Sequence, residues 1–326
     1  MTVLPTGSRQ LGGGGRHAPR LGRRLLRGAG LGALIVVLAA AAVVRSNIAG
    51  RSTVAADEVI EIHSAHGTSF VPALQGKRPL FILTLGSDAR PGQSILRERS
   101  DSIHIIGVNL ATHRATILGF PRDSWVPIPG HGTAKITTAM TFGGPSLTVA
   151  TIERLTGIRI DFWALTNFRG LVRMVDGIGP LQVRVVQGMH DRYSGANFSQ
   201  GVHKFRGIQA LQFARDRHDV PNGDLTRSLN QGKLMQAAMA KLHKDFARTP
   251  AAVFTWLTIG WHNIHTDLSV TTLLDLILTA TQIPSKQVNN LVVPATTGSV
   301  GAQSVVFISP RASAVYADMR QDGIAR

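Results

Sequence analysis

Among the charged side chains between residues 88 and 123, six stand at the ends of short apolar runs, three carboxylates and three guanidiniums. They are Asp88, Arg90, Arg99, Asp101, Arg122 and Asp123. Guanidinium forks match the oxygens of phosphate groups, and aspartates suit Mg²⁺. The residue types therefore indicate an anionic ligand held in part through a hard metal ion. Salt-bridged turns would use the same residues, so this segment alone leaves both interpretations open.

A second polar group lies about a hundred residues further along the chain. Arg215 and Arg217 follow a predicted helix from Gly207 to Ala214, and in extended backbone two such side chains would face one anion. Arg227 and Gln231 are four residues apart and share a face of the next predicted helix. A helix N-terminus also favours phosphate. This group is again open to either interpretation, a phosphate site or surface ion pairing.

Three short apolar runs would position the first group. They are Phe81 to Leu85, Ile103 to Val108 and Ala115 to Phe120, with the length and β-branched content of buried strands. The charged residues stand at the ends of these predicted strands. His104 lies inside the second run, where we expect a packed or edge histidine.

Beyond Asp123, predicted helices and strands alternate, which is typical of a layered α/β domain. Val126 to Gly144 reads as a turn-rich connection, and Asp224 can N-cap a long amphipathic helix. The other predicted elements are a helix from Ser146, its N-cap, to Thr156, a strand from Ile160 to Leu165, a helix from Phe168 to Val175 and a strand from Leu181 to Val186. We therefore predict a three-layer α/β/α domain with a central mixed sheet.

The C-terminal third is richer in apolar residues than in chemistry. Thr249-Pro250 is a favourable helix start. Ser269 to Ile283 fits either a core helix or one wall of a lipid groove. Asn289 to Val293 and Val305 to Ile308 are predicted as closing strands, and a helix is expected around Ala312 to Arg320.

The N-terminus predicts a membrane anchor. Residues 1–27 are basic and rich in glycine, typical of a disordered cytoplasmic tail. Residues 28–44 carry no charge and would span roughly 26 Å as a helix, slightly less than a bilayer core of about 30 Å. Arginines mainly precede this segment, which favours a cytoplasmic N-terminus and an extracytoplasmic C-terminal bulk. A cleaved signal peptide and a buried core helix are the alternatives.

Residues 45–75 are predicted to be a stalk, and residues 76–326 a folded domain that carries both charged groups. The chain has 326 residues and no cysteine, which excludes disulfides, thiolate zinc sites and a cysteine nucleophile. Its net charge of +16 includes seven arginines within residues 1–45, where there is no acidic residue. Because no reader motif accompanies the charge and the predicted span places the domain outside the cytoplasm, we expect no nucleic-acid partner.

Taken in order, the charged motifs resemble those of the LytR-CpsA-Psr family. The motifs are LGSDAR, RSD, PRD, Lys135-Ile136, Gly143-Gly144, ALQFARDR and GDLTRSLNQ, and they cover roughly residues 76–245. An arginine-rich tail followed by one membrane span is also the layout of that family. The resemblance implies a single-pass membrane protein with an extracytoplasmic domain.

The resemblance further implies a phosphotransferase that moves a glycopolymer from a polyprenyl-pyrophosphate carrier onto peptidoglycan. Asp88 and Asp101 would hold Mg²⁺, with Asp88 also a candidate to accept the proton of the acceptor hydroxyl. Asp123 would orient an arginine. The positions that would bind the pyrophosphate are Arg99, Arg122, Arg215, Arg217, Arg227 and Gln231, and of the arginines Arg99 and Arg122 would be catalytic. The alternative function is a non-catalytic polyprenyl-phosphate-binding or envelope regulatory protein.

The chain departs from the family pattern at several positions. Asn230-Gln231 stands where the family often has Arg-Gln, and Lys135-Ile136-Thr137 replaces a Lys-Ile-Asn pattern. Neither departure removes a proposed metal ligand or principal phosphate ligand. They affect the expected choice of substrate.

Overall fold

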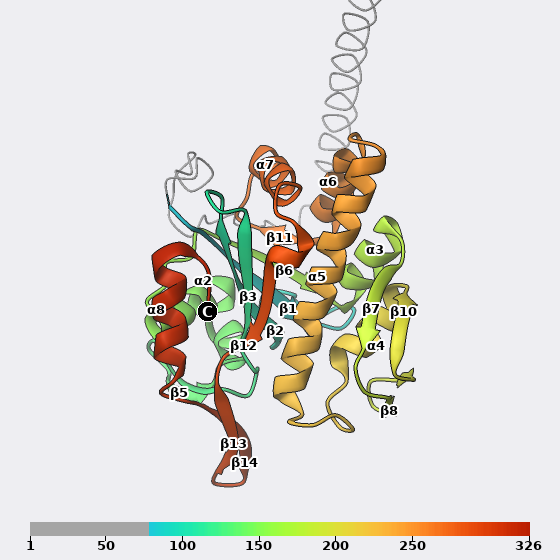
Figure 1. The fold of residues 1–326 in the computed structure, drawn as a ribbon. Coiled ribbons are helices and arrows are strands. Elements are labelled where there is room, and N and C mark those ends of the chain that lie inside the picture. Colours follow the sequence, from blue (N-terminus) through green and yellow to red (C-terminus); the bar gives the residue numbers. More distant parts are fainter. Residues whose placement is uncertain (1–77) are drawn as a thin grey trace, which may run out of the picture. The chain divides into compact units, whose positions relative to one another are not determined.

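A six-stranded mixed sheet lies at the centre of residues 78–326, the part of the chain that the computed structural model describes (Figure 1). Its strand order is β11-β6-β1-β2-β3-β12. The strands are β1 Leu80–Ser87, β2 Ser100–Asn109, β3 Arg114–Gly119, β6 Phe162–Asn167, β11 His265–Thr266 and β12 Val288–Val292. β1, β2 and β3 form an antiparallel meander, while β6 and β12 join β1 and β3 in parallel.

The three strands predicted around the first charged group are confirmed, with ends that differ by one to three residues. Helices cover both faces of this sheet, which explains why its strands read as continuous apolar runs rather than as alternating patterns. Leu83, Ile103 and Ile105 are completely buried. The charged residues accordingly begin where the strands leave the core.

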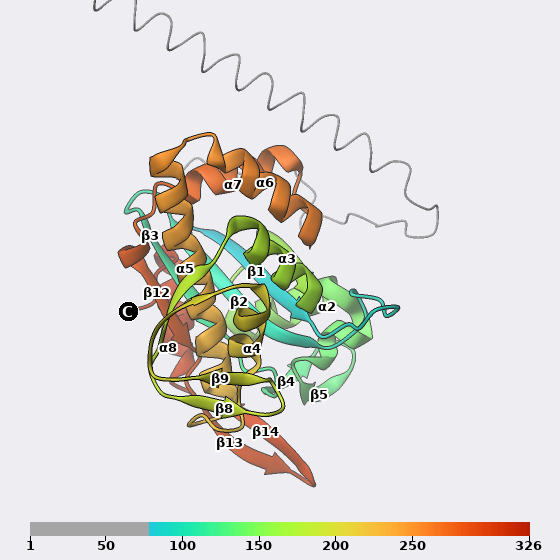
Figure 2. The same cartoon turned by 90° about the vertical axis from the view of Figure 1, so that its right-hand side faces the viewer.

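The helices form the outer layers (Figures 1 and 2). On one face, helices α2 (Thr138–Thr156) and α8 (Ala312–Asp322) pack against the largest apolar cluster, which contains Leu83, Ile105 and Met319. On the other face, side chains of α5 (Asp224–Arg248) and α7 (Val270–Ala280) pack against Leu80 and Ile117. The predicted mixed α/β fold with a central sheet is confirmed.

Beside the central sheet, a smaller apolar cluster joins helices α3 and α4 to two hairpins. The helices are α3 Phe168–Ile178, α4 Gly207–Arg215 and, next to α3, α6 Ala252–Asn263. The hairpins pair β7 Leu181–Val185 with β10 Gly201–Phe205, and β8 Met189–Asp191 with β9 Ala196–Phe198. The predicted strand from Leu181 to Val186 therefore exists, but it pairs outside the central sheet.

One predicted connection and one predicted strand pairing were wrong. Val126 to Gly144, expected to be turn-rich, contains a hairpin of β4 (Trp125–Ile128) and β5 (Gly132–Lys135) and the first turns of α2. Val305 to Ile308 lies in β14 (Gln303–Ile308), which pairs with β13 (Ala295–Val300) in a separate hairpin rather than closing the sheet. The strand that pairs with β3 at the edge of the sheet is β12, which follows a 3₁₀ turn at Ser285–Gln287.

The predicted helix from Ser146 to Thr156 is the second part of α2, because Gly144 has non-helical backbone angles (φ +68°, ψ −158°) directly before Pro145 and divides α2 by a kink. Two other predicted helix starts were shifted. α5 is capped by Gly223, and Asp224 is its first helical residue rather than its N-cap. Thr249 closes α5, so α6 starts at Ala252.

The predicted tail, span and stalk, residues 1–75, lie outside the described residues. Within residues 78–326, every helix is too short or too polar to cross a membrane. α7 has no fully buried residue, although Leu273 and Leu276 pack against the apolar cluster behind the sheet. Its environment is therefore intermediate between the core helix and the exposed wall that its composition allowed.

Candidate active site

A cavity of about 890 Å³ lies between the central sheet and helices α3 to α6. The cavity extends along helix α5, because Arg227 and Ala238 both line it and lie about 16 Å apart along the helix. The ionisable residues of the lining include Asp88, Arg90, Asp101, Arg122, Arg215, Arg217, His218 and Arg227. The apolar residues include Leu171, Met174, Ile178, Trp256, Ile259 and Ile264. The structure thus brings the two charged groups of the sequence into one cavity that continues into apolar surface.

Two carboxylates meet at the ends of β1 and β2. Asp88 follows β1 directly and its backbone N–H donates to the carbonyl of Arg99 (3.0 Å), while Asp101 is the second residue of β2. Asp88 Oδ1 is buried and has no hydrogen-bond partner. Burial, and then the nearby carboxylate of Asp101, raise the pKa of Asp88 above its ordinary value. A cation between the two groups would relieve both effects.

The donor set fits a hard divalent cation such as Mg²⁺. This ion commonly takes one or two carboxylates and completes its shell with water and phosphate oxygens. Elsewhere in residues 78–326, as here, no three His, Asp or Glu side chains converge on a possible metal position. Asp88 and Asp101 are therefore the residues that could hold the ion, together with oxygens of a bound phosphate.

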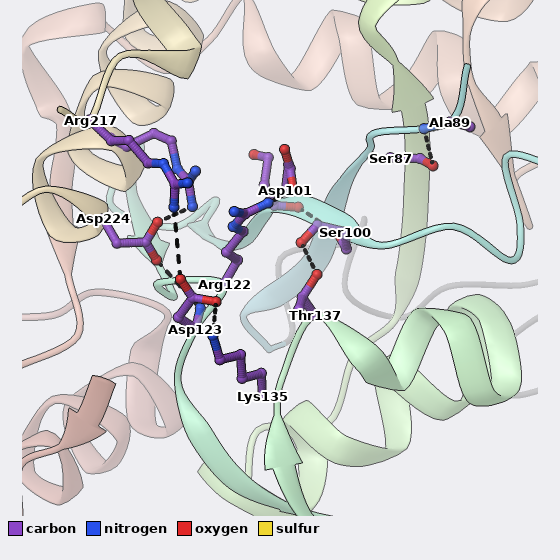
Figure 3. A network of polar contacts seen from close by, with 12 residues as sticks. Ser87, Ala89, Ser100, Asp101, Arg122, Asp123, Lys135, Thr137, Arg217 and Asp224 are labelled. Atoms are coloured by element: carbon purple, nitrogen blue, oxygen red, sulfur yellow. Dashed lines mark hydrogen bonds and ion pairs between the residues drawn. The ribbon is translucent and has the colours of Figure 1, made fainter. Parts of the chain in front are cut away.

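Arg122 stands between two carboxylates (Figure 3). Its Nη1 donates to Asp101 Oδ1 at 2.5 Å. Burial acts to lower the pKa of Arg122, but the ion pair with Asp101 and the charge of Asp123 outweigh it and raise the pKa. On its other side, Asp123 contacts Lys135 Nζ at 3.1 Å and Arg217 Nη1 at 4.0 Å. Asp123 thus orients Arg217, the kind of role that the sequence predicted for it.

The first turns of α5 supply a buried guanidinium. The side chain of Arg227 is 5% exposed and pairs with Asp224, whose carboxylate also accepts from the backbone N–H of Asp123 (3.4 Å). Burial, and then the positive charge of Arg122, lower the pKa of Arg227 to about 9. A second anion near Arg227 would therefore be favourable. Gln231 links β2 to α4, because its Nε2 donates to the carbonyls of Asp101 and Ala214 (both 3.2 Å).

Phe168 holds two further arginines at the cavity. The guanidinium carbon of Arg215 lies 4.9 Å from the centre of its ring, and that of Arg90 lies 5.9 Å away. Arg99, predicted to bind the pyrophosphate, has an exposed side chain outside the cavity lining. It is close enough to Asp88 that its charge acts to lower the pKa of that carboxyl.

Sequence reasoning missed Phe168, Asp224 as a partner of Arg227, and the pairing of Lys135 with Asp123. A signal for Phe168 was available. It follows β6 directly, and β6 runs parallel to β1 with Asn167 opposite Ser87. Parallel strands end at the same edge of a sheet, so residues that follow Ser87 and Asn167 lie close together.

Asp216, between Arg215 and Arg217, is completely buried, and neither of its carboxylate oxygens has a hydrogen-bond donor. Its carboxyl faces those of Asp219 and Asp191. Burial, and then these two carboxyls, raise the pKa of Asp216 well above the ordinary value of 3.8. The segment that carries two cavity arginines therefore rests on a buried acidic contact.

Known proteins share this sequence pattern and fold. A family model described as the LytR_cpsA_psr family matches residues 44–321. The polyisoprenyl-teichoic acid–peptidoglycan teichoic acid transferase TagU of Oceanobacillus iheyensis is 35% identical over 202 residues, which are 60% of this chain and 61% of TagU. The chain thus spans about three fifths of the length of that relative.

Two solved structures show the same fold. Protein gbs0355 from Streptococcus agalactiae gives a TM-score of 0.69 at 21% identity, covering 79% of this chain and 92% of that protein. TagT with bound octaprenyl pyrophosphate lipid gives a TM-score of 0.60 at 22% identity, covering 82% of this chain and 98% of TagT.

Proposed function

The chain belongs to the LytR-CpsA-Psr family, and from this premise we propose that it is a phosphotransferase that attaches a glycopolymer from a polyprenyl-pyrophosphate carrier to peptidoglycan. The observation that carries the proposal is the cavity, in which arginines and two carboxylates lie next to an apolar surface. Such a lining suits a ligand with a doubly charged phosphate head and a long hydrocarbon tail. TagU, a relative named for this kind of transfer, supports the reaction class.

In this proposal, the prenyl chain lies against α3, α5 and α6, where Ile178, Ala238 and Ile259 line the cavity. The pyrophosphate lies among Arg122, Arg217 and Arg227. Guanidiniums in a partly desolvated site bind phosphate oxygens strongly, and burial, followed by the charge of Arg122, lowers the pKa of Arg227, so a further anion beside it would be favourable.

The reaction exchanges one phosphorus–oxygen bond for another. A hydroxyl oxygen of peptidoglycan attacks the phosphorus next to the sugar, the bond from that phosphorus to the bridging oxygen breaks, and prenyl phosphate leaves. The hydroxyl proton is released in the same exchange. Arg122 and Arg227 stabilise the charge that develops on the phosphate oxygens, and Asp123 keeps Arg217 in position. A bound Mg²⁺, held by Asp88 and Asp101, would neutralise charge on the pyrophosphate.

The proposal includes a membrane anchor at residues 28–44, with the N-terminus in the cytoplasm and the catalytic domain outside. Its support is the uncharged segment preceded by arginines in the sequence. Protease added to intact cells should then cleave the C-terminal domain. Protection of that domain would contradict this orientation.

The test is release of prenyl phosphate from a prenyl-pyrophosphate-linked glycan by the full chain in detergent, with Mg²⁺ and peptidoglycan. Asp88→Asn and Arg122→Ala should each lower the rate by about 10²–10³-fold, since each removes charge stabilisation from the transition state. A chelator should have a similar effect. Arg184→Ala is the matched control, because Arg184 is exposed on β7 and lies outside the cavity lining.

Undiminished release in both variants would remove these residues from the active site. If the wild-type chain binds the lipid tightly but releases no prenyl phosphate even with peptidoglycan, the alternative of a non-catalytic lipid-binding or regulatory protein would be favoured instead.

A further inference from the structure

An exposed aromatic side chain stands in the charged part of the cavity and is not used by the reaction described above. Tyr193 lies in the turn between β8 and β9, lines the cavity and is 62% exposed. The ring of His218 lies 4.5 Å from it, centre to centre, at an angle of 43°. His218 follows Arg217 directly and also lines the cavity. The two rings form an open corner, which we call the aromatic corner.

A buried carboxylate accepts hydrogen bonds from both residues of the aromatic corner. Asp191 is 3% exposed, and its Oδ1 accepts from the backbone N–H of Tyr193 at 2.8 Å. Its Oδ2 accepts from His218 Nδ1 at 3.0 Å. Burial acts to raise the pKa of Asp191, but the hydrogen bonds from His218 and Tyr193 outweigh it and lower the pKa to about 2. The carboxylate is thus charged and holds the corner under all physiological conditions.

Arg192 completes the rim of the aromatic corner. Its Nη2 donates to the hydroxyl of Tyr193 at 2.9 Å, and its guanidinium carbon lies 4.9 Å from the ring centre. An exposed ring on a loop would ordinarily be free to change rotamer. Here the ring is held in place without being covered, so Tyr193 would lose little side-chain entropy when a ligand packs on it.

We propose that Tyr193, His218 and Arg192 bind the first sugar of the glycopolymer, the pyranose ring joined to the pyrophosphate. The proposal rests on the proposed function, and it adds a specificity-determining subsite to it. A pyranose has an apolar C–H face, which packs on an aromatic ring, and a rim of hydroxyls, which can accept from a guanidinium or donate to an imidazole nitrogen. The aromatic corner offers these surfaces in that arrangement.

The position of the aromatic corner favours the donor sugar over the other parts of the ligand. A pyrophosphate bound by Arg217 has its next covalent group within reach of the neighbouring residue, His218. The prenyl chain has its own surface, on α3 and α6, whereas the aromatic corner is exposed and has a polar rim. The corner therefore suits the sugar end of the ligand and not the lipid end.

The experiment compares two probes on the full chain in detergent: a prenyl pyrophosphate, and the same prenyl pyrophosphate carrying one hexosamine. Wild type should bind the sugar-bearing probe more tightly. Tyr193→Ala should weaken that probe by roughly five- to tenfold and leave the sugar-free probe unchanged, since one aromatic contact is lost. Tyr193→Phe should retain most of the difference, because it keeps the ring.

Val202→Ala is the matched control, because Val202 is 50% exposed on β10 and lies outside the cavity lining. Thermal unfolding of each variant shows whether the fold is intact, as expected for an exposed side chain. Equal weakening of both probes by Tyr193→Ala, or no change in either, would overturn the subsite. An effect confined to the KM for peptidoglycan would also overturn it, by assigning the corner to the acceptor. If wild type binds neither probe, the proposed function fails as well.

Discussion

Asp216 has an environment unlike that of the other aspartates at the cavity. Asp101 and Asp123 each contact an arginine, whereas Asp216 is buried against the carboxyls of Asp219 and Asp191. Two facing carboxyls without a donor between them are held together only if one carries a proton. The protonated form of Asp216 is therefore the one that the folded chain favours.

The acidic contact makes stability depend on pH. Because the pKa of Asp216 is raised in the folded chain, the folded state binds a proton that the unfolded chain has released. Stability is then lost as the pH rises from about 4, the ordinary pKa, to about 8, the pKa of Asp216 in the folded chain. Asp216→Asn, which imitates the protonated acid, should raise the melting temperature at neutral pH by a few degrees. The gain should shrink as the pH approaches 4.

The control for this prediction is Asp275→Asn, which removes an exposed carboxylate on α7 and should change the melting temperature little. Calorimetry of both variants across this pH range gives the comparison. A lower melting temperature for Asp216→Asn at every pH would show that the charged carboxylate has a stabilising partner.

At the scale of single residues, the sequence predicted which side chains gather but not what each contacts. Asp88, Asp101 and Arg122 could be predicted because their types suit a metal ion and a phosphate and they stand at strand ends. The hydrogen bonds of Gln231 and the neighbours of Asp216 could not be predicted, because they depend on how α5 and the segment after α4 lie against the sheet. Spacing along one helix does not contain that information.

Helix α5 lies close against the central sheet at Ser228. Gly119 at the end of β3 lies against Ser228 of α5, and a Cβ at Gly119 would come within 2.3 Å of Ser228 Oγ. The completely buried His104 joins β2 to the same helix, with Nε2 at 3.0 Å from the carbonyl of Ser228. Burial lowers the pKa of His104 to about 4, so its ring is neutral at physiological pH and donates from Nε2. It is a packed histidine, as predicted.

This contact predicts a rescue experiment. Gly119→Ala should cost about 1–3 kcal/mol of stability through overpacking, and should weaken prenyl pyrophosphate binding because Arg227 precedes Ser228 on the displaced helix. Ser228→Ala alone should be nearly neutral, since the buried hydroxyl has no partner. The double variant should recover a large part of both losses. Urea unfolding and binding of prenyl pyrophosphate measure the two effects.

Strictly additive losses in the double variant would show that the two residues do not press on each other. The Ser228→Ala variant serves as the internal control, because it changes the helix without adding bulk to the strand.

At the scale of elements, type was predicted more reliably than boundaries or partners. The meander of β1 to β3 and the long helix α5 follow from apolar runs and a helical pattern. The kink at Gly144 and the separate hairpin of β13 and β14 do not, because a short apolar run looks the same in a central sheet and in a hairpin.

Taken whole, the described part of the chain surrounds a cavity whose apolar lining predicts a dependence on prenyl length. Gly260 on α6 lines the cavity, and a Cβ there would meet only Leu273 at 4.0 Å. Gly260→Phe should therefore fold, and should occupy space needed by the distal part of the tail. We expect about tenfold weaker binding of a long prenyl pyrophosphate and little change for a ten-carbon one.

Gly260→Ala is the matched control, since it adds a methyl group but no bulk. Isothermal titration with both chain lengths distinguishes the variants. Equal binding of both lengths by Gly260→Phe would place the tail elsewhere.

At this scale the sequence indicated the layered fold and the family, because seven motifs occur in order over roughly 170 residues. It did not indicate which helices enclose the cavity. Ser269 to Ile283 was considered for the lipid wall, yet the lining comes from α3, α5 and α6. Apolar composition identifies a helix whose surface must be buried. Only the tertiary packing decides whether protein or ligand buries that surface.

The parallel pairing of β3 with β12 joins residues roughly 170 positions apart. During synthesis, the β1 to β3 meander, which ends just before Arg122, can form from one continuous stretch, whereas the arginines after α4 and the last sheet strand emerge much later. Assembly of the sheet therefore depends on slow, long-range encounters. A nascent chain would contain the carboxylates of Asp88 and Asp101 before it contained all the arginines that would bind a pyrophosphate. Capture of the lipid would thus report that folding is complete, and would hold the finished chain in that state.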